Sequence, residues 1–150
     1  FPRLIEYRGE PLSFLQQLGF NTVRLAEMPS REMLEEARRL GMWLVCPPPR
    51  PPDLSNPYGD AAGSASAEFG PWFDAVLAWD MGDRWTADEY EVLKRWTEFV
   101  RRHDQPRPRP LVGGAVSDVR MVSRQVDVVD LHRRSLGTTF PLDRSGDWLR

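Results

Sequence analysis

The sequence predicts a parallel α/β fold built from repeated strand and helix units. Twice, an amphipathic stretch ends in Leu-Gly and an apolar run follows at once, first at Leu18-Gly19 and again at Leu40-Gly41. Glycine directly after a helix suits the left-handed conformation that would strain a side chain. The run Met42–Val45 has no polar alternation, which is typical of a strand covered on both faces. Helix, glycine and buried strand in succession indicate βα units on a parallel sheet.

The first third of the chain contains three predicted strands and two predicted helices. We expect strands over Arg3–Tyr7, Asn21–Ala26 and Met42–Cys46. A helix is expected over Pro11–Leu18, since proline is tolerated in the first turn. A second helix begins after Ser30, whose hydroxyl suits an N-cap. Its apolar residues recur at helical spacing on one face, at Met33, Leu34, Ala37 and Leu40.

A long loop follows at about residues 47–71. Five of the six residues in Pro47–Pro52 are proline, which does not fit a helix interior or a central strand. The rest is rich in Pro, Gly, Ala and Ser, with one helical turn expected near Ala65–Phe69. Loops of this length in compact domains are often functional, and a surface insertion is the alternative.

The remaining strands are expected at Val76–Asp80, Leu111–Val116 and Val126–Leu131. Between the first two, Thr86 and Glu89 have the spacing of a capping box and open the clearest helix, which runs to about His103. A short helix is expected over Asp118–Arg124, and another begins near Asp147.

These elements amount to six strands and about five helices, each strand leading into a helix. Right-handed crossovers wind such units in one direction. A closed eight-stranded barrel needs roughly 200 residues or more. We therefore expect residues 1–150 to form a single partial (β/α) barrel domain with about six of the eight strands. The chain opens with Phe1 in strand-like sequence, so we expect it to be a piece of a longer protein and to have that protein's other domains as partners.

Composition excludes several classes of function. The net charge of −2 provides no long-range positive field that would attract nucleic acid. A single cysteine and two histidines argue against a disulfide framework and against a zinc centre built from these residues. No apolar run approaches the roughly 20 residues of a membrane span, and no secretory signal is visible. No glycine-rich phosphate loop occurs, and no cofactor is expected.

Polar residues gather where the predicted strands end, which is where parallel α/β folds carry their chemistry. In chain order they are Glu6, Arg8, Arg24, Glu27, Cys46, Asp80, Asp83, Arg84, Ser117, Asp118, Asp130, His132, Arg133 and Arg134. Carboxylates, an arginine and a histidine around one rim suit acid–base chemistry on a polar substrate. The indoles of Trp43, Trp79 and Trp85 offer flat apolar faces for a sugar ring.

Each candidate also has a structural interpretation. Arg24 suits an ion pair with Glu6 or Asp80 as well as it suits a ligand. An aspartate beside a turn, as at Asp80 and Asp83, often bonds the loop backbone. A lone histidine such as His132 is more often structural. Trp72, Trp79 and Trp96 fit a core better than a sugar platform, and Cys46 fits a buried, inert thiol.

The segment Leu18–Leu25 resembles the second-strand motif of the (β/α)₈ retaining glycoside hydrolases, the group of TIM-barrel enzymes that includes cellulase-like and β-galactosidase-like members. In that group the strand-two arginine points into the active site and supports the catalytic carboxylates, and Arg24 matches that position. Val76–Asp83 looks like the family's fourth strand. The resemblance implies a barrel fold and a carbohydrate ligand.

The chain departs from the family at the catalytic positions. The fourth strand of the family ends in the acid/base glutamate, and Arg84 stands there, preceded by Asp83. An arginine does not donate a proton at neutral pH. The family's nucleophile comes from a seventh strand, beyond the six that this chain contains.

From these observations we expect a glycoside-hydrolase-like domain that acts on or binds carbohydrate. If it is active, Asp80 or Asp83 is the acid, while Arg24, His132, Glu6 and Trp85 contact substrate. One alternative is a non-catalytic sugar-binding or structural barrel domain of a larger protein. Another is a sugar isomerase or metal-dependent hydrolase, for which Glu6, Asp80 and His132 are the plausible metal ligands.

Overall fold

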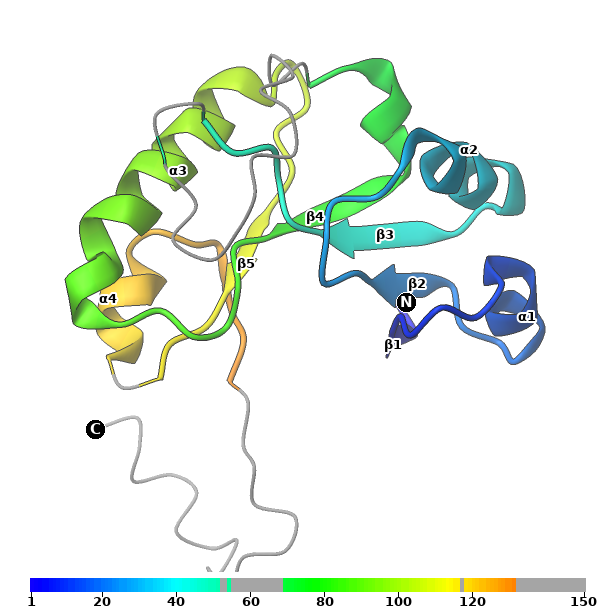
Figure 1. The fold of residues 1–150 in the computed structure, drawn as a ribbon, viewed down its shortest axis with the longest axis horizontal. Helices are drawn as coiled ribbons and strands as arrows, with labels where there is room; N and C mark the ends of the chain where they lie inside the picture. Colours follow the sequence, from blue (N-terminus) through cyan, green and yellow to red (C-terminus); the bar gives the residue numbers. More distant parts are fainter. Residues whose placement is uncertain (52–53, 55–68, 117, 132–150) are drawn as a thin grey trace, which may run out of the picture.

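A computed structural model of the chain describes residues 1–51, 54, 69–116 and 118–131. Six strands form one sheet in chain order, and each neighbouring pair is parallel. The sheet curls into a half barrel (Figure 1), which confirms the parallel α/β class. A closed eight-stranded barrel is not present among the described residues. The strands are β1 (Leu4–Glu6), β2 (Thr22–Arg24), β3 (Trp43–Cys46), β4 (Val76–Asp80), β5 (Leu111–Gly113) and β6 (Val128–Val129).

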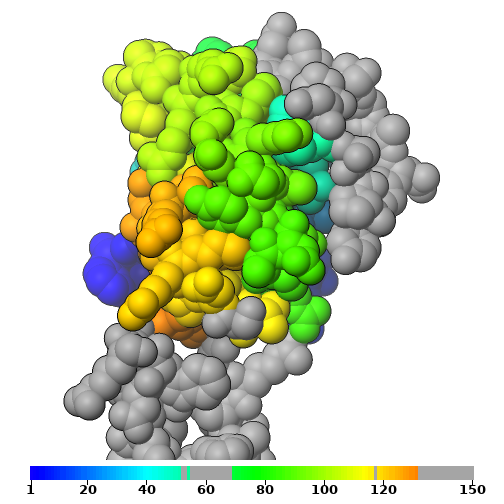
Figure 2. Space-filling model, turned by 90° about the vertical axis from the view of Figure 1, so that its left-hand side faces the viewer, coloured from blue at the N-terminus to red at the C-terminus, as the bar shows by residue number. Residues whose placement is uncertain are grey.

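Helices surround the outside of the curled sheet. Figure 1 shows α1 and α2 on one side and α3 and α4 on the other, and Figure 2 shows α3 and α4 forming the outer surface on their side. The α-helices are α1 (Leu12–Gln17), α2 (Arg31–Leu40), α3 (Tyr90–His103) and α4 (Val119–Ser123); two short 3₁₀ helices are η1 (Pro71–Ala75) and η2 (Ala87–Glu89).

Local sequence signals end and begin these helices as predicted. Gly19 and Gly41 follow α1 and α2 with φ of 92° and 65°. These are left-handed conformations that glycine adopts without strain. The Ser30 hydroxyl accepts a hydrogen bond from Met33 N at 3.3 Å. The Glu89 carboxylate accepts one from Thr86 N at 3.1 Å, which fixes the start of the η2–α3 unit.

The predicted and observed elements differ at several ends. β5 ends at Gly113 and not at Val116, because the chain beyond it forms only one isolated bridge, between Ala115 and Trp85. β6 covers only Val128–Val129. The sequence did not predict η1, which directly precedes β4. Of the expected turn at 65–69 only Phe69 is described, and the helix start near 147 lies outside the described residues.

The core lies between the sheet and the helices. It is built around Trp79, Leu12, Leu15, Met42, Leu44, Leu93 and Leu111, all fully buried. Trp96 joins them, so its prediction and that of Trp79 as core residues are confirmed. The prediction for Trp72 was wrong: it is 37% exposed on η1, beside the guanidinium of Arg31 on α2. The Trp72 ring therefore lies against a charged side chain on the surface of α2 and not in a buried apolar pocket.

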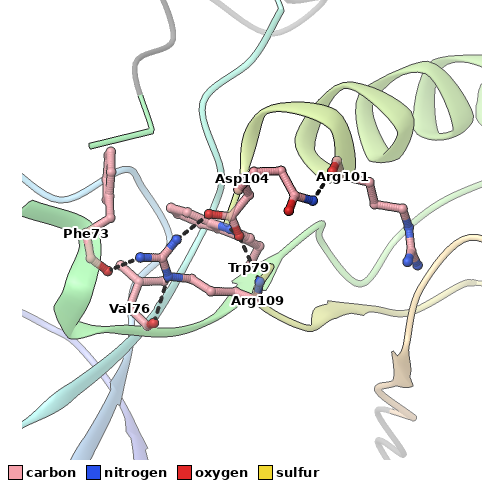
Figure 3. A network of polar contacts seen from close by, with 7 residues as sticks. Phe73, Val76, Trp79, Arg101, Asp104 and Arg109 are labelled. Carbon is pink, nitrogen blue, oxygen red and sulfur yellow. Dashed lines mark hydrogen bonds and ion pairs between the residues drawn. The ribbon is translucent and has the colours of Figure 1, made fainter. Parts of the chain in front are cut away.

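A polar network fastens the amino end of β4 to the end of α3. Asp104 accepts hydrogen bonds from the indole nitrogen of Trp79 at 2.8 Å and from Arg109 N at 2.8 Å, and pairs with the Arg109 guanidinium. Arg109 also donates to the carbonyls of Val76 and Phe73 at 3.0 and 2.8 Å. Figure 3 shows the Arg109 guanidinium between the Asp104 carboxylate and the backbone carbonyls of Phe73 and Val76. The network satisfies a buried charge at the face opposite the carboxyl ends of the strands.

Candidate functional site at the carboxyl ends of the strands

A pocket of about 500 Å³ lies at the carboxyl ends of the strands. Its lining comes from the ends of β1, β2 and β4 and from the residues that follow β1 to β4: Glu6, Tyr7, Arg24, Leu25, Ala26, Pro47, Asp80, Gly82 and Asp83. Four sequence-predicted site residues, Glu6, Arg24, Asp80 and Asp83, are therefore brought together. We call this cavity the mouth pocket.

Arg24 lies between two carboxylates at the floor of the mouth pocket. Its Nε atom donates to Oδ2 of Asp80 at 2.6 Å, and its Nη1 atom donates to Oδ2 of Asp130 at 2.6 Å. The side chains of Arg24 and Asp80 are 16% and 8% exposed. The predicted ion pair between Arg24 and Asp80 is confirmed, and Asp130 is a second partner that the sequence did not reveal.

These three residues come from alternate strands. Arg24 and Asp80 are the last residues of β2 and β4, and Asp130 directly follows β6. In parallel barrels, side chains from alternate strands fill the interior in layers. The Arg24–Asp80–Asp130 group is thus a polar layer at the carboxyl end of the half barrel.

The two aspartates raise the pKa of Arg24 above its ordinary value. The main cause is the hydrogen bond with Asp80, while burial acts in the opposite sense and Asp130 adds to the rise. The guanidinium accordingly stays charged throughout the pH range in which the protein is folded. It supplies a fixed positive charge and directed N–H donors to the pocket floor.

Asp80 is also bonded to the loop that follows it. Its Oδ1 atom accepts a hydrogen bond from Gly82 N at 2.9 Å, as expected for an aspartate beside a turn. Gly82 has a φ of 95°, a conformation that glycine adopts readily. With one oxygen bonded to Arg24 and the other to Gly82, Asp80 holds the floor and the loop carrying Asp83.

Glu6 and Asp83 both line the mouth pocket. Glu6 pairs with Arg24 in the register of β1 and β2, and its carboxylate lies 3.5 Å from Arg8 Nη2. Asp83 follows Gly82 and is partly buried. Carboxylates that line a pocket are groups that can accept hydrogen bonds from a polar ligand or exchange protons with it.

The other predicted site residues lie elsewhere. Trp85 is not part of the pocket lining: its indole nitrogen donates to Met81 O at 2.7 Å and its ring meets Trp96 edge to face. Trp43 begins β3, at the end of the sheet away from the pocket. Trp79 is buried in the core. His132 lies outside the described residues.

Two further groups bear on metal and thiol chemistry. Within the described residues, no cluster of three or more His, Cys, Asp or Glu side chains is arranged to hold a metal ion. The predicted ligand set Glu6, Asp80 and His132 stays a prediction, because His132 lies outside the described residues. Cys46 is buried at the end of β3, and burial raises the pKa of its thiol to about 12. Such a thiol is a poor nucleophile, which agrees with the prediction of an inert cysteine.

In the part of the chain that the structure describes, no helix is long and apolar enough to cross a bilayer.

Comparison with solved structures finds chains of similar fold. No family model matches the chain, and no curated protein matches it. A crystal structure of a glycosyl hydrolase family 2 member from Bacteroides cellulosilyticus is similar to 89% of the chain, with a TM-score of 0.54 and 21% sequence identity. A second structure of a family 2 member from this organism is similar to 79% of the chain, with a TM-score of 0.53 and 23% identity. The matches span 19% and 17% of those chains. At this identity the likeness concerns the fold alone.

Proposed function

We propose that this domain binds carbohydrate in the mouth pocket. The observation that carries the proposal is the convergence of Glu6, Asp83 and the Arg24–Asp80 pair on one cavity of about 500 Å³. Cavities of roughly 300–1,000 Å³ with a few directed polar groups are typical of small-ligand sites. The similarity of the fold to family 2 glycosyl hydrolases supports a saccharide as the ligand.

The roles of the residues follow from their bonds. Arg24 and Asp80 bond to each other and build the floor. Glu6 and Asp83 are the other two carboxylates of the lining, and in this proposal they accept hydrogen bonds from sugar hydroxyls. Tyr7 and Leu25 add apolar surface to the lining, against which the C–H face of a sugar ring packs.

Hydrolysis is a second candidate function, and Asp83 is the residue that favours it. Asp83 lies one position before the place where the resembled enzymes carry their acid/base glutamate. Asp80 is a poor acid because its carboxylate is ion-paired with Arg24, which favours the ionised form. Retaining hydrolysis also requires a second carboxylate about 5–5.5 Å from the acid.

Calorimetric titration of the full natural polypeptide with neutral mono- and oligosaccharides tests the binding proposal. Glu6→Gln and Asp83→Asn each remove one charge from the pocket wall, and we expect each to weaken the best saccharide roughly tenfold or more, the worth of a hydrogen bond to a charged group. Glu98→Gln, on the exposed side of α3, is the matched control. Absence of binding by every saccharide, or equal losses in the control, would contradict the proposal.

Aryl-glycoside turnover separates hydrolysis from binding. If Asp83 donates the proton, Asp83→Asn abolishes turnover while some binding remains. Equal rates in the variant and the natural protein would remove Asp83 from any mechanism. Binding without turnover in the natural protein would leave a carbohydrate-binding domain.

A further inference from the structure

Arg24 is the only cation among the described residues that line the mouth pocket. An arginine fork is the usual protein partner of a sugar carboxylate, because it donates two parallel N–H bonds. Whether the pocket favours a neutral or an anionic ligand therefore depends on which groups of the protein already bind the Arg24 guanidinium.

Two aspartates of the protein accept hydrogen bonds from Arg24. Asp80 takes its Nε–H group and Asp130 takes an Nη1–H group, each at 2.6 Å. One guanidinium facing two carboxylates has a net charge of −1 as a group. An anionic ligand approaching this floor meets repulsion in place of an open fork.

Asp130 differs from Asp80 in its position. It is not among the lining residues of the mouth pocket, and it reaches Arg24 from β6, on the far side of the half barrel. Its side chain is 27% exposed, against 8% for that of Asp80. A change at Asp130 thus alters the charge of the floor and leaves the pocket wall intact.

We infer that Asp130 is a specificity-determining residue, whose carboxylate together with that of Asp80 outweighs the charge of Arg24 and so makes the mouth pocket select uncharged saccharides over uronic acids. The inference rests on the proposed function, since it concerns the ligand of the same pocket. Asp130 acts through Arg24 and needs no contact with the sugar.

Asp130→Asn tests the inference because asparagine keeps the shape and an oxygen that accepts from Arg24 Nη1, while the negative charge is lost. Binding is measured with two matched pairs of probes, methyl glucoside against methyl glucuronide and methyl galactoside against methyl galacturonide, in the full natural polypeptide. We expect the affinity for the uronide relative to the neutral glycoside to rise about fivefold or more, and the rise to shrink at high salt.

Asp127→Asn is the matched control. It makes the same chemical change just before β6, where Asp127 pairs with Arg101 at 3.0 Å. In the Asp127→Asn protein, the affinity for the uronide relative to the neutral glycoside should equal that of the natural protein. Asp130→Ser, a second uncharged variant, replaces Asp130→Asn if that protein does not fold. NMR of the Arg24 side-chain N–H groups reports whether the guanidinium keeps its place.

The outcomes separate the two proposals. A raised ratio in the Asp130 variant alone supports the inference. An unchanged ratio with both glycosides bound, or an equal change in the Asp127 variant, overturns it and leaves carbohydrate binding standing. Failure of neutral and acidic glycosides alike to bind either protein refutes the proposed function and the inference with it.

Discussion

The guanidinium of Arg24 on β2 donates to the carboxylate of Asp130 after β6 over 2.6 Å, although three strands lie between β2 and β6 in the sheet. In a flat sheet, four strand spacings would separate those positions by about 19 Å. An arginine side chain does not span that distance. The hydrogen bond is therefore direct evidence that the sheet curls enough to bring alternate strand ends around one axis.

Removing this charge is expected to destabilise the fold. Arg24→Gln leaves two partly buried carboxylates without their cation, and losing one partner of a buried ion group costs about 3 kcal/mol. Urea denaturation measures the loss in free energy of unfolding. Adding Asp80→Asn to the variant should recover part of it, since one unpaired charge is then gone. Arg39→Gln on the surface of α2, whose carboxylate partner is 3.9 Å away, should change stability by less than about 0.5 kcal/mol.

Gly114 sets the spacing between the loops after β4 and β6. A Cβ atom at this position would lie 2.5 Å from the carbonyl oxygen of Asp130 and 3.2 Å from the Cα atom of Asp83. Both neighbours are backbone, so Gly114→Ala must move Asp130 and Asp83 apart. We expect a loss of about 1–3 kcal/mol in stability, typical of overpacking, together with weaker saccharide binding.

Gly113→Ala is the comparison for that prediction. The nearest atom to its Cβ is a side-chain methyl carbon of Val126 at 3.1 Å, which can rotate, although Gly82 O lies at 3.3 Å. The smaller clash should cost less stability and less affinity than Gly114→Ala. A larger effect at Gly113, by thermal denaturation and calorimetry, would argue against the loop-spacing role of Gly114.

Local signals made much of the fold predictable. The positions of Gly19 and Gly41 after their helices and the Thr86–Glu89 pair act within a few residues of chain, so the sequence contains their full cause. The pairing of Arg24 with Asp80 was also within reach, because parallel strands place their carboxyl ends at one edge.

The contacts that depend on curvature were not predictable in the same way. Asp130 was visible as a strand-end carboxylate, yet its bond to Arg24 requires the sheet to curl across four strand spacings. The useful signal, recognised only with the structure, is that Arg24, Asp80 and Asp130 end alternate strands. The pairing of Asp104 with Arg109 and Trp79 likewise arises from the packing of a helix end on a strand start.

The thiol of Cys46 predicts a loss of stability in alkali. Burial is the main cause that raises its pKa from 9.0 to about 12. Above pH 9 the unfolded chain loses the thiol proton while the folded chain keeps it, so the unfolded state binds fewer protons and stability falls as pH rises toward 12. The expected loss between pH 9 and pH 10 is about 1 kcal/mol.

Urea denaturation of the natural protein and of Cys46→Ala across this pH range isolates that contribution. Other groups titrate equally in both proteins, and only the difference between the two curves belongs to the thiol. The variant should be less stable at pH 8 because it leaves a small cavity, and the gap should narrow by pH 10. A gap that stays constant would show that Cys46 titrates normally in the folded protein.

Substitutions in the Asp104 network are expected to lower stability without changing ligand binding. Asp104 accepts bonds from Trp79 and Arg109, and Arg109 lies with its guanidinium 5.3 Å from the centre of the Trp79 ring. Asp104→Ala would leave the mostly buried Arg109 guanidinium without its carboxylate partner and the buried Trp79 indole N–H without its acceptor, at a cost of about 3–5 kcal/mol. Asp104→Asn keeps one oxygen acceptor and should cost less. At temperatures where these variants remain folded, saccharide affinity should equal that of the natural protein, because neither Asp104 nor Arg109 lines the mouth pocket and Arg109 bonds to the chain at the start of β4. Loss of affinity in the folded Asp104→Asn protein would show instead that the two ends of the sheet are coupled.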